Sequence, residues 1–137
     1  MTEALYLHPA AAASLAKWHD MLAKRNLSGL GDIVHPSVIF RSPVAHNVYN
    51  GADTLAFILR NAIEVFSNFT YHRQAATADG LNIVLEFSAN IGDKAIKGID
   101  FIRFDETGKI VEFEVMTRPL SGTQALAAAM GQRMAAK

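Results

Sequence analysis

The segment Lys94–Arg118 reads KAIKGIDFIRFDETGKIVEFEVMTR, and its pattern indicates the fold of this chain. Successive side chains of a β-strand point to opposite faces of the sheet. Residues 94–105 and 110–118 both alternate with this period, and Val111, Phe113 and Val115 are expected to share one face. Residues 106–109, Glu-Thr-Gly-Lys, are typical of a tight turn. The segment is therefore predicted to form a hairpin of two long antiparallel strands.

Two more long strands are predicted just before this hairpin. Residues 69–75 and 83–91 alternate between apolar and polar side chains, as strands with one buried face do. Asp79 and Gly80 form a strong turn signal between them, and Gly92 and Asp93 form the next one. The four long strands are thus expected to follow one another as an antiparallel meander, with one or two short strands in addition.

Helical periodicity is found on both sides of this meander. Apolar residues recur at helical spacing over about 9–26 and 53–67, and an alanine- and methionine-rich helix is expected over 123–135. The glycines of 27–35 predict only a short, broken helix there, followed by a short strand at 38–41. The sequence therefore predicts an α+β fold in which helices cover one face of a curved antiparallel sheet.

Composition limits the possible functions. The 137 residues, half of them apolar, are expected to form one domain spanning 1–137. Thirteen basic and thirteen acidic residues balance, which argues against binding to nucleic acid or to an acidic membrane surface. Cysteine is absent, which excludes disulfides, thiolate metal sites and cysteine nucleophiles.

The sequence also lacks the signals of several other classes of protein. No convincing targeting segment or membrane-spanning stretch is found, so a cytoplasmic location is expected. The sequence contains no glycine-rich phosphate loop, and its five histidines never stand at a helical ligand spacing with a carboxylate. We therefore expect neither a metal site nor a cofactor.

Asp100 is the unusual residue of the hairpin. It shares its strand face with Ile102 and Phe104. If that face turns toward the helices, the carboxyl group is buried among apolar side chains and must be paired or become neutral. A neutral carboxylic acid in a dry pocket can donate a hydrogen bond to a developing oxyanion. Alternatively, Asp100 lies on the surface, solvated or paired with Arg103 or Lys97.

The run from Gly98 to Ile110, GIDFIRFDETGKI, resembles the matching hairpin of the nuclear-transport-factor-2-like superfamily. This superfamily includes ketosteroid isomerases, SnoaL-like polyketide cyclases and limonene epoxide hydrolases. The resemblance extends over nearly the whole chain, including residues 35–43, HPSVIFRSP. It implies a cone-shaped fold with a central pocket and a symmetric homodimer formed through the outer sheet face.

The resemblance also assigns expectations to single residues. Asp100 falls where the isomerases keep a protonated aspartic acid in the oxyanion hole. Trp18 falls where they place a phenol, and Ser42 where they place the carboxylate base. A serine hydroxyl cannot abstract a carbon-bound proton near neutral pH without a base of its own. Gly98 replaces the arginine of the epoxide hydrolases. Standard ketosteroid isomerisation is therefore not expected.

Two histidines are considered as a replacement base. His46 follows Ser42 in the loop, and His19 stands beside Trp18. A histidine with a pKa near neutrality suits acid–base work, although both also fit ordinary surface positions. Asp100, Ser42 and His46 are taken as the candidate catalytic residues.

The favoured function is a pocket that binds a small, largely apolar ligand. Any reaction would be of the isomerase, cyclase or hydrolase type, acting on a carbonyl-like substrate with Asp100 as acid or oxyanion donor. The alternative is a non-catalytic dimeric interaction module, whose outer sheet face carries Val84, Ile99, Phe101 and Met116. The walls of the pocket are expected to come from Trp18, Phe40, Phe57, Phe87, Ile102, Phe113 and Val115.

Overall fold

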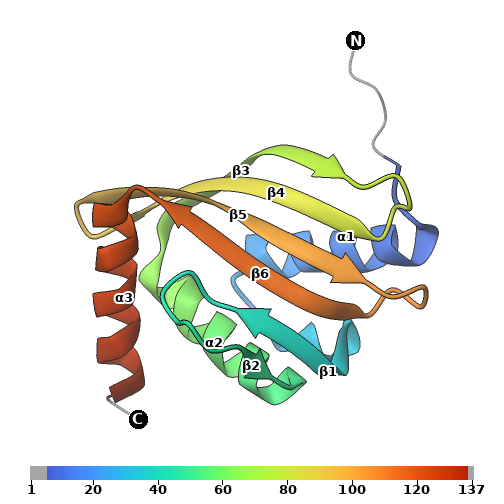
Figure 1. Cartoon of the computed structure of the whole chain (residues 1–137), viewed down its shortest axis with the longest axis horizontal. Coiled ribbons are helices and arrows are strands. Elements are labelled where there is room, and N and C mark those ends of the chain that lie inside the picture. The colour runs from blue at the N-terminus through green and yellow to red at the C-terminus, as the bar shows by residue number, and fades with distance from the viewer. Residues whose placement is uncertain (1–5, 136–137) are drawn as a thin grey trace.

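The computed structural model describes residues 6–135 of the chain. Helices and strands follow the predicted order (Figure 1). The helices are α1 (Pro9–Ala23), the short 3-10 helix η1 (Leu30–Asp32), α2 (Ala52–Val65) and α3 (Leu120–Ala135). The strands are β1 (Val34–Arg41), β2 (Tyr49–Asn50), β3 (Ser67–Ala76), β4 (Asn82–Ile91), β5 (Lys94–Phe104) and β6 (Ile110–Arg118).

All six strands form one curved sheet in the order β2-β1-β6-β5-β4-β3. Strands β3 to β6 are the predicted antiparallel meander. Strand β1 returns to pair with β6, and this one pairing is parallel. The α+β class and the curved, mostly antiparallel sheet are confirmed. The parallel pairing was not predicted, because the residues of β1 do not encode which distant strand they join.

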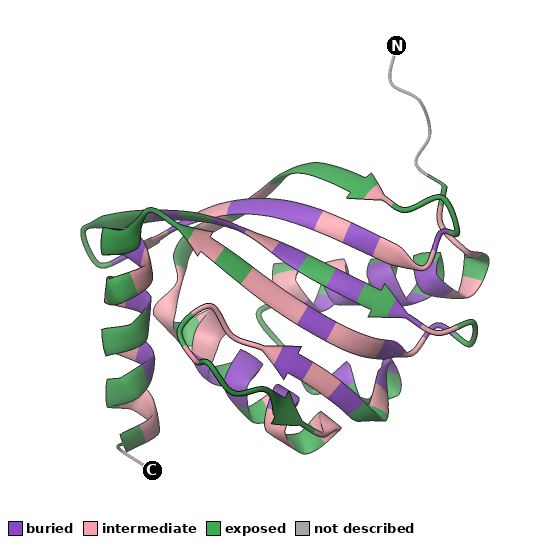
Figure 2. Ribbon diagram, in the orientation of Figure 1, coloured by how far each residue is buried: buried purple, intermediate pink, exposed green. Residues whose placement is uncertain are grey.

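Burial follows the period of two along the central strands. On β4 every second residue from Ile83 to Ile91 is buried, and on β5 every second residue from Ile96 to Phe104. Figure 2 shows this alternation as bands along β5, whereas β4 has a longer buried stretch because Glu86 is buried as well. These side chains meet α1 and α2, which lie against the concave face of the sheet (Figure 1). Burying each large apolar side chain contributes about 1.5–3 kcal/mol.

The prediction that Val111 shares one face of β6 with Phe113 and Val115 is wrong at the start of the strand. Phe104 pairs with Ile110 but Arg103 pairs with Glu112, so a bulge leaves Val111 without a partner. Ile110 is fully buried as a result, while Val111 is only partly buried. A bulge changes which residues point inward, and the simple alternation could not reveal it.

Helix α1 ends at Ala23, three residues earlier than predicted. Arg25 adopts a left-handed φ of 49°, and the N–H of Asn26 bonds back to the carbonyl of Met21. At its other end, α1 is joined to the β5–β6 turn by the Ser14 hydroxyl, which donates to the carbonyl of Gly108. A side chain at Gly108 would collide with the backbone of Ala10, so glycine allows this close approach.

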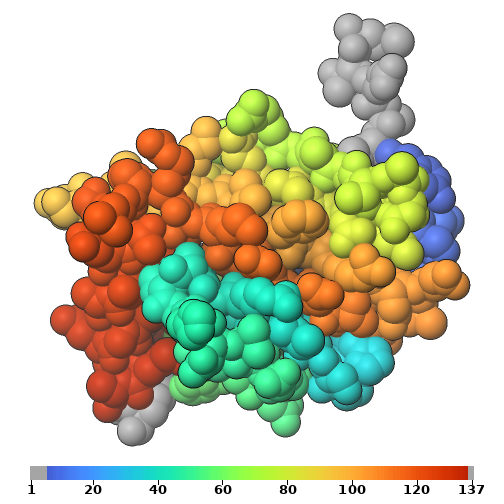
Figure 3. All heavy atoms as spheres, in the orientation of Figure 1, coloured from blue at the N-terminus to red at the C-terminus, as the bar shows by residue number. Residues whose placement is uncertain are grey.

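Helix α3 packs against α2 and the sheet at one end of the molecule, with Leu126 and Met130 buried on its inner side (Figures 1 and 2). In the space-filling view (Figure 3), the outer face of the sheet forms a closed surface, and α3 stands beside it at the left. None of the helices within residues 6–135 is both long and apolar enough to cross a membrane.

Candidate active site

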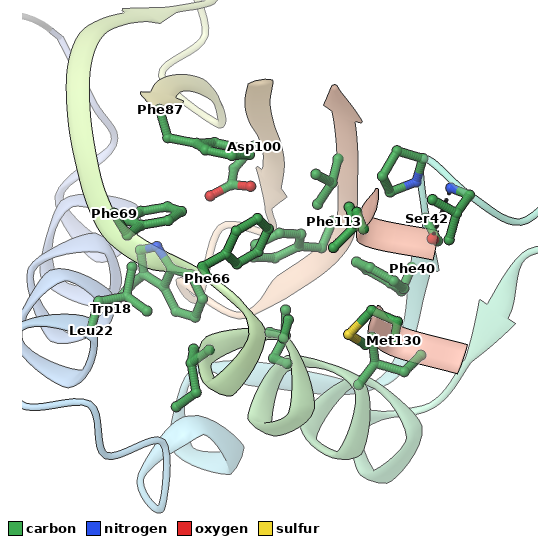
Figure 4. Close-up of a pocket in the computed structure, with 18 of the residues that line it drawn as sticks. Trp18, Leu22, Phe40, Ser42, Phe66, Phe69, Phe87, Asp100, Phe113 and Met130 are labelled. Carbon is green, nitrogen blue, oxygen red and sulfur yellow. Dashed lines mark hydrogen bonds between the residues drawn. The ribbon is translucent and has the colours of Figure 1, made fainter. Parts of the chain in front are cut away.

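A cavity of about 500 Å³ lies between the concave face of the sheet and the helices. Such a volume falls within the range of roughly 300–1,000 Å³ that is usual for small-molecule sites. Every strand and all three α-helices contribute to its walls, which are mainly aromatic and aliphatic (Figure 4). Asp100 is the only carboxylate among the described residues that line it.

Asp100 points into this cavity from the middle of β5 (Figure 4). It has Gly98 and Ile102 as neighbours on the buried face of the strand, and only 6% of its surface is exposed. The side chains of Lys97 and Arg103 alternate onto the opposite face. Of the two positions considered for Asp100, the structure shows the inward one, and the surface alternative is wrong.

Asp100 is held by a directional chain of hydrogen bonds. The indole Nε1–H of Trp18, on α1, donates to the hydroxyl oxygen of Tyr71, on β3, at 3.0 Å. The Tyr71 hydroxyl in turn donates to Oδ2 of Asp100 at 2.5 Å. Because indole nitrogen can only donate, the direction of the whole chain is fixed from α1 through β3 to β5.

Burial determines the protonation states of the side chains in this hydrogen-bond chain. Desolvation raises the pKa of Asp100 to about 7, although the hydrogen bond from Tyr71 opposes the shift. Desolvation and the neighbouring Asp100 carboxyl group raise the pKa of Tyr71 well above its ordinary value, so the phenol keeps its proton. Asp100 is therefore the member of the chain that gains or loses a proton near neutral pH.

The second carboxyl oxygen of Asp100 is available to a ligand. Within residues 6–135 no hydrogen bond reaches Oδ1, and no fully buried side-chain nitrogen or oxygen in that range lacks a partner. Oδ1 is therefore open to the cavity. In its protonated form Asp100 can donate from this oxygen while Oδ2 accepts from Tyr71.

Gly98 shapes the cavity next to Asp100. A Cβ atom at Gly98 would stand 2.7 Å from Cζ of Phe87 and would also collide with the carbonyl oxygen of Met116. The Phe87 ring occupies the space over this glycine and stacks on Phe69 at 4.9 Å between ring centroids. The position that carries an arginine in the epoxide hydrolases therefore has no room for a side chain here.

The structure brings most of the predicted pocket residues together. Ser42 also lines the cavity, and its hydroxyl oxygen accepts from the backbone N–H of Val44 at 3.1 Å (Figure 4). The rings of Trp18 and Phe113 pack in a T-shaped arrangement with 5.4 Å between their centroids. The predicted residues that line the cavity, besides Asp100 and Ser42, are Trp18, Phe40, Phe87, Phe113 and Val115.

Three predicted site residues lie elsewhere. Phe57 is 41% exposed, because the helical period places it on the same face of α2 as Arg60 and Glu64. Ile102 is fully buried in the core rather than at the cavity, because alternation predicts the face of a strand but not the depth along it. His46 is exposed in the loop between β1 and β2 and does not line the cavity.

Sequence reasoning missed several residues of the site. Tyr71, whose hydroxyl donates to Asp100, was not among the expected site residues. Met130 and Met134, which line the cavity from α3, were not expected there either. The inward alternation of Phe69 and Tyr71 was the available signal for the tyrosine. No local pattern showed that α3 closes the cavity.

The acidic and histidine side chains within the described range do not form a metal centre. No three or more of them are grouped so that they could hold a metal ion. The site is thus an apolar cavity with one titratable acid, supported by a tyrosine and a tryptophan.

This fold and site define a small α+β domain with a ligand-sized cavity inside a curved sheet. Residues 15–113 match the family model of the SnoaL-like domain. The chain therefore belongs to the SnoaL-like family and has the nuclear-transport-factor-2-like fold that was expected from its hairpin. A comparison with curated proteins finds no match.

Solved structures support this assignment. A steroid delta-isomerase from Pseudomonas aeruginosa is 54% identical, with a TM-score of 0.95 over 97% of either chain. An uncharacterised bacterial protein with a cystatin-like fold from Silicibacter pomeroyi is 32% identical, with a TM-score of 0.81 over 92% of this chain and 85% of its own. The epoxide hydrolase/cyclase-like enzyme SalBIII is 12% identical, with a TM-score of 0.66 over 82% and 92% of the two chains, and shares the fold alone.

Proposed function

We propose that the protein binds a small, largely apolar molecule with a carbonyl-type oxygen and that Asp100 donates a hydrogen bond to that oxygen. The observation that carries this proposal is the hydrogen-bond chain from Trp18 through Tyr71 to Asp100, whose Oδ1 atom is open to the cavity. A donor chain of this kind is polarised along its length, and in an apolar surrounding each bond is stronger than in water.

The composition of the cavity wall supports an apolar, flat ligand. The sequence contains eight phenylalanines, three tyrosines and one tryptophan, and eight of these twelve aromatic residues line the cavity. Apolar walls with a few convergent polar groups are usual in ligand sites. Asp100 and Ser42 provide those polar groups here.

The chemistry that fits this arrangement is proton transfer next to a carbonyl group. When a proton leaves the carbon beside a carbonyl, negative charge develops on the oxygen, and a positioned donor stabilises it. The pKa of about 7 suits Asp100 to this task, because an acid works best when its pKa lies near the working pH. Identity of 54% to a steroid delta-isomerase favours an isomerase over a cyclase or hydrolase and makes steroid ketones suitable probes.

Calorimetric titration tests the binding proposal. We would compare an enone steroid with the matched steroid that lacks the ketone oxygen, using the wild type, Asp100→Leu and the control Asp93→Asn in an exposed turn. The wild type and the control are expected to prefer the ketone, and the enone absorption band is expected to move to longer wavelength when bound. Asp100→Leu is expected to lose both effects. Equal binding of the two steroids to the wild type would contradict the proposal.

A second candidate function, a dimeric interaction module, is favoured by the outer face of β5 and β6. Phe101 is 36% exposed and Met116 is 44% exposed, and Ile99 pairs directly with Met116 in the sheet. Large apolar side chains exposed together mark contact surfaces. We propose a second copy of this chain as the partner. Sedimentation velocity is expected to give a dimer that Phe101→Glu with Met116→Glu converts to a monomer, and a monomeric wild type at micromolar concentration would contradict it.

A further inference from the structure

The candidate site has an acid but no evident base. Ser42 lines the cavity, yet its hydroxyl cannot take a carbon-bound proton near neutral pH without a base of its own. The titratable groups on the described cavity wall are His19, Arg25, Tyr49, Tyr71 and Asp100. Arginine cannot accept a proton, and tyrosine holds its own at neutral pH. With Asp100 acting as the donor, this leaves His19.

His19 lies beside the hydrogen-bond chain. It follows Trp18 on α1, lines the same cavity and packs its ring edge-on against Tyr71, with 5.4 Å between ring centroids and 82° between ring planes. Tyr71 therefore contacts His19 through its ring and Asp100 through its hydroxyl. The imidazole and the carboxyl group therefore both contact Tyr71 and both line the same cavity.

We propose that His19 is the catalytic base of this site and takes a proton from the carbon next to the ligand's carbonyl group. This inference rests on the proposed function, in which Asp100 holds the carbonyl oxygen. The C–H bond breaks, its electron pair forms a carbon–carbon double bond, and the carbonyl oxygen becomes an enolate oxygen that accepts a hydrogen bond from Asp100. The imidazolium of His19 then returns the proton to the far carbon of the conjugated system, which moves a double bond with no oxidant or reductant.

The surroundings of His19 suit this role. Among the described residues no hydrogen bond occupies its ring nitrogens, so a lone pair is free. Partial burial lowers the pKa of His19, and the imidazole is therefore neutral at pH 7. Tyr71, with a raised pKa, is neutral as well. Among the charged residues on the cavity wall, Arg25 is the one closest to His19 in the sequence. It donates to the carbonyl of Ile63 at 2.6 Å and faces Glu64 at 3.6 Å.

The test uses a β,γ-unsaturated steroid ketone as the probe. Its isomerisation gives a conjugated enone that absorbs in the ultraviolet, and exchange of its acidic protons in D₂O is measured in parallel by NMR. We would compare the wild type, His19→Gln and the control His72→Gln, whose exposed ring contacts Ser88 outside the cavity. His19→Gln is expected to lower kcat and exchange by about 10²- to 10⁴-fold while probe affinity stays within a few-fold. His72→Gln is expected to match the wild type.

The pH profile separates a base from a merely structural residue. In the wild type, kcat is expected to rise with pH as His19 loses its proton, and His19→Gln is expected to lose this rising limb. Unchanged turnover in His19→Gln would overturn the assignment of the base and leave the proposed function intact. Probe binding by the wild type without isomerisation or exchange would also overturn it. Failure to bind any ketone would instead contradict the proposed function itself.

Discussion

Tyr71 on β3 and Asp100 on β5 are joined across the intervening strand β4 by a hydrogen bond of 2.5 Å. Strand neighbours are about 4.7–4.9 Å apart, so two residues separated by a whole strand do not normally meet. The curvature of the sheet brings the long tyrosine side chain over β4 to the carboxyl group. The same curvature creates the cavity, so the bond and the site have one structural origin.

Asp100→Asn tests the cost of burying this carboxyl group. The folded-state pKa of about 7 lies above the ordinary value of 3.8, so the folded state binds the proton more tightly than the unfolded state. Wild-type stability is therefore expected to fall as pH rises from about 4 to about 7, by at most about 1.4 kcal/mol per pH unit from this group, and then to level off. Asn at position 100 does not titrate. Urea unfolding at several pH values is therefore expected to show that the stability of Asp100→Asn increases relative to that of the wild type as pH rises over this window. A constant difference at all pH values would contradict the raised pKa.

Ligand affinity is expected to depend on the same proton. A carbonyl oxygen accepts a hydrogen bond only from protonated Asp100, so affinity for a steroid ketone should be constant below pH 6. Above about pH 7 it should fall by up to tenfold per pH unit until the ionised form dominates binding. Asp100→Asn keeps an N–H donor in place and is expected to bind with little pH dependence. Calorimetric titration between pH 5 and 9 measures both proteins, and tighter ketone binding at high pH would rule out the donor role.

Tyr71→Phe removes the middle of the hydrogen-bond chain. Asp100 loses the bond that lowers its pKa, so the pKa is expected to rise further, and Nε1 of Trp18 loses its acceptor. A buried donor without a partner costs about 1–3 kcal/mol of stability. Denaturant unfolding is expected to show this loss, while the control Tyr49→Phe, a partly exposed ring next to Phe40, should change stability little. Equal stability of the two variants would mean that the hydrogen-bond chain contributes nothing to the stability of the fold.

The face that Asp100 shares with Ile102 and Phe104 could be predicted from the sequence because it depends on local geometry alone. The period of two holds along β5, and the buried neighbours Gly98 and Ile102 fix the face. The four long strands and their turns were predictable for the same reason. Each turn residue and each alternating pair acts within a few positions of its own place in the chain.

The rest of the site depends on contacts between distant elements. The bond from Tyr71 needs the curvature of the whole sheet, and Met130 reaches the cavity only because α3 folds back onto α2. Phe57 was expected in the pocket, although the periodicity of α2 places it on the same face as Arg60 and Glu64. Here the helical period alone would have given the correct position.

Gly98→Ala tests whether the cavity wall requires a residue without a side chain. The added Cβ would stand 2.7 Å from Phe87 and press on the carbonyl of Met116, and the backbone oxygen cannot move away as a flexible side chain could. Overpacking of this kind costs about 1–3 kcal/mol, and displacing Phe87 would also move the wall beside Asp100. The matched control is Gly131→Ala on α3, where nothing lies within 4 Å of the new Cβ and alanine favours the helix by about 0.5–1 kcal/mol. Thermal unfolding is expected to show opposite shifts for the two variants, and a stabilised Gly98→Ala would mean that Phe87 has room to move.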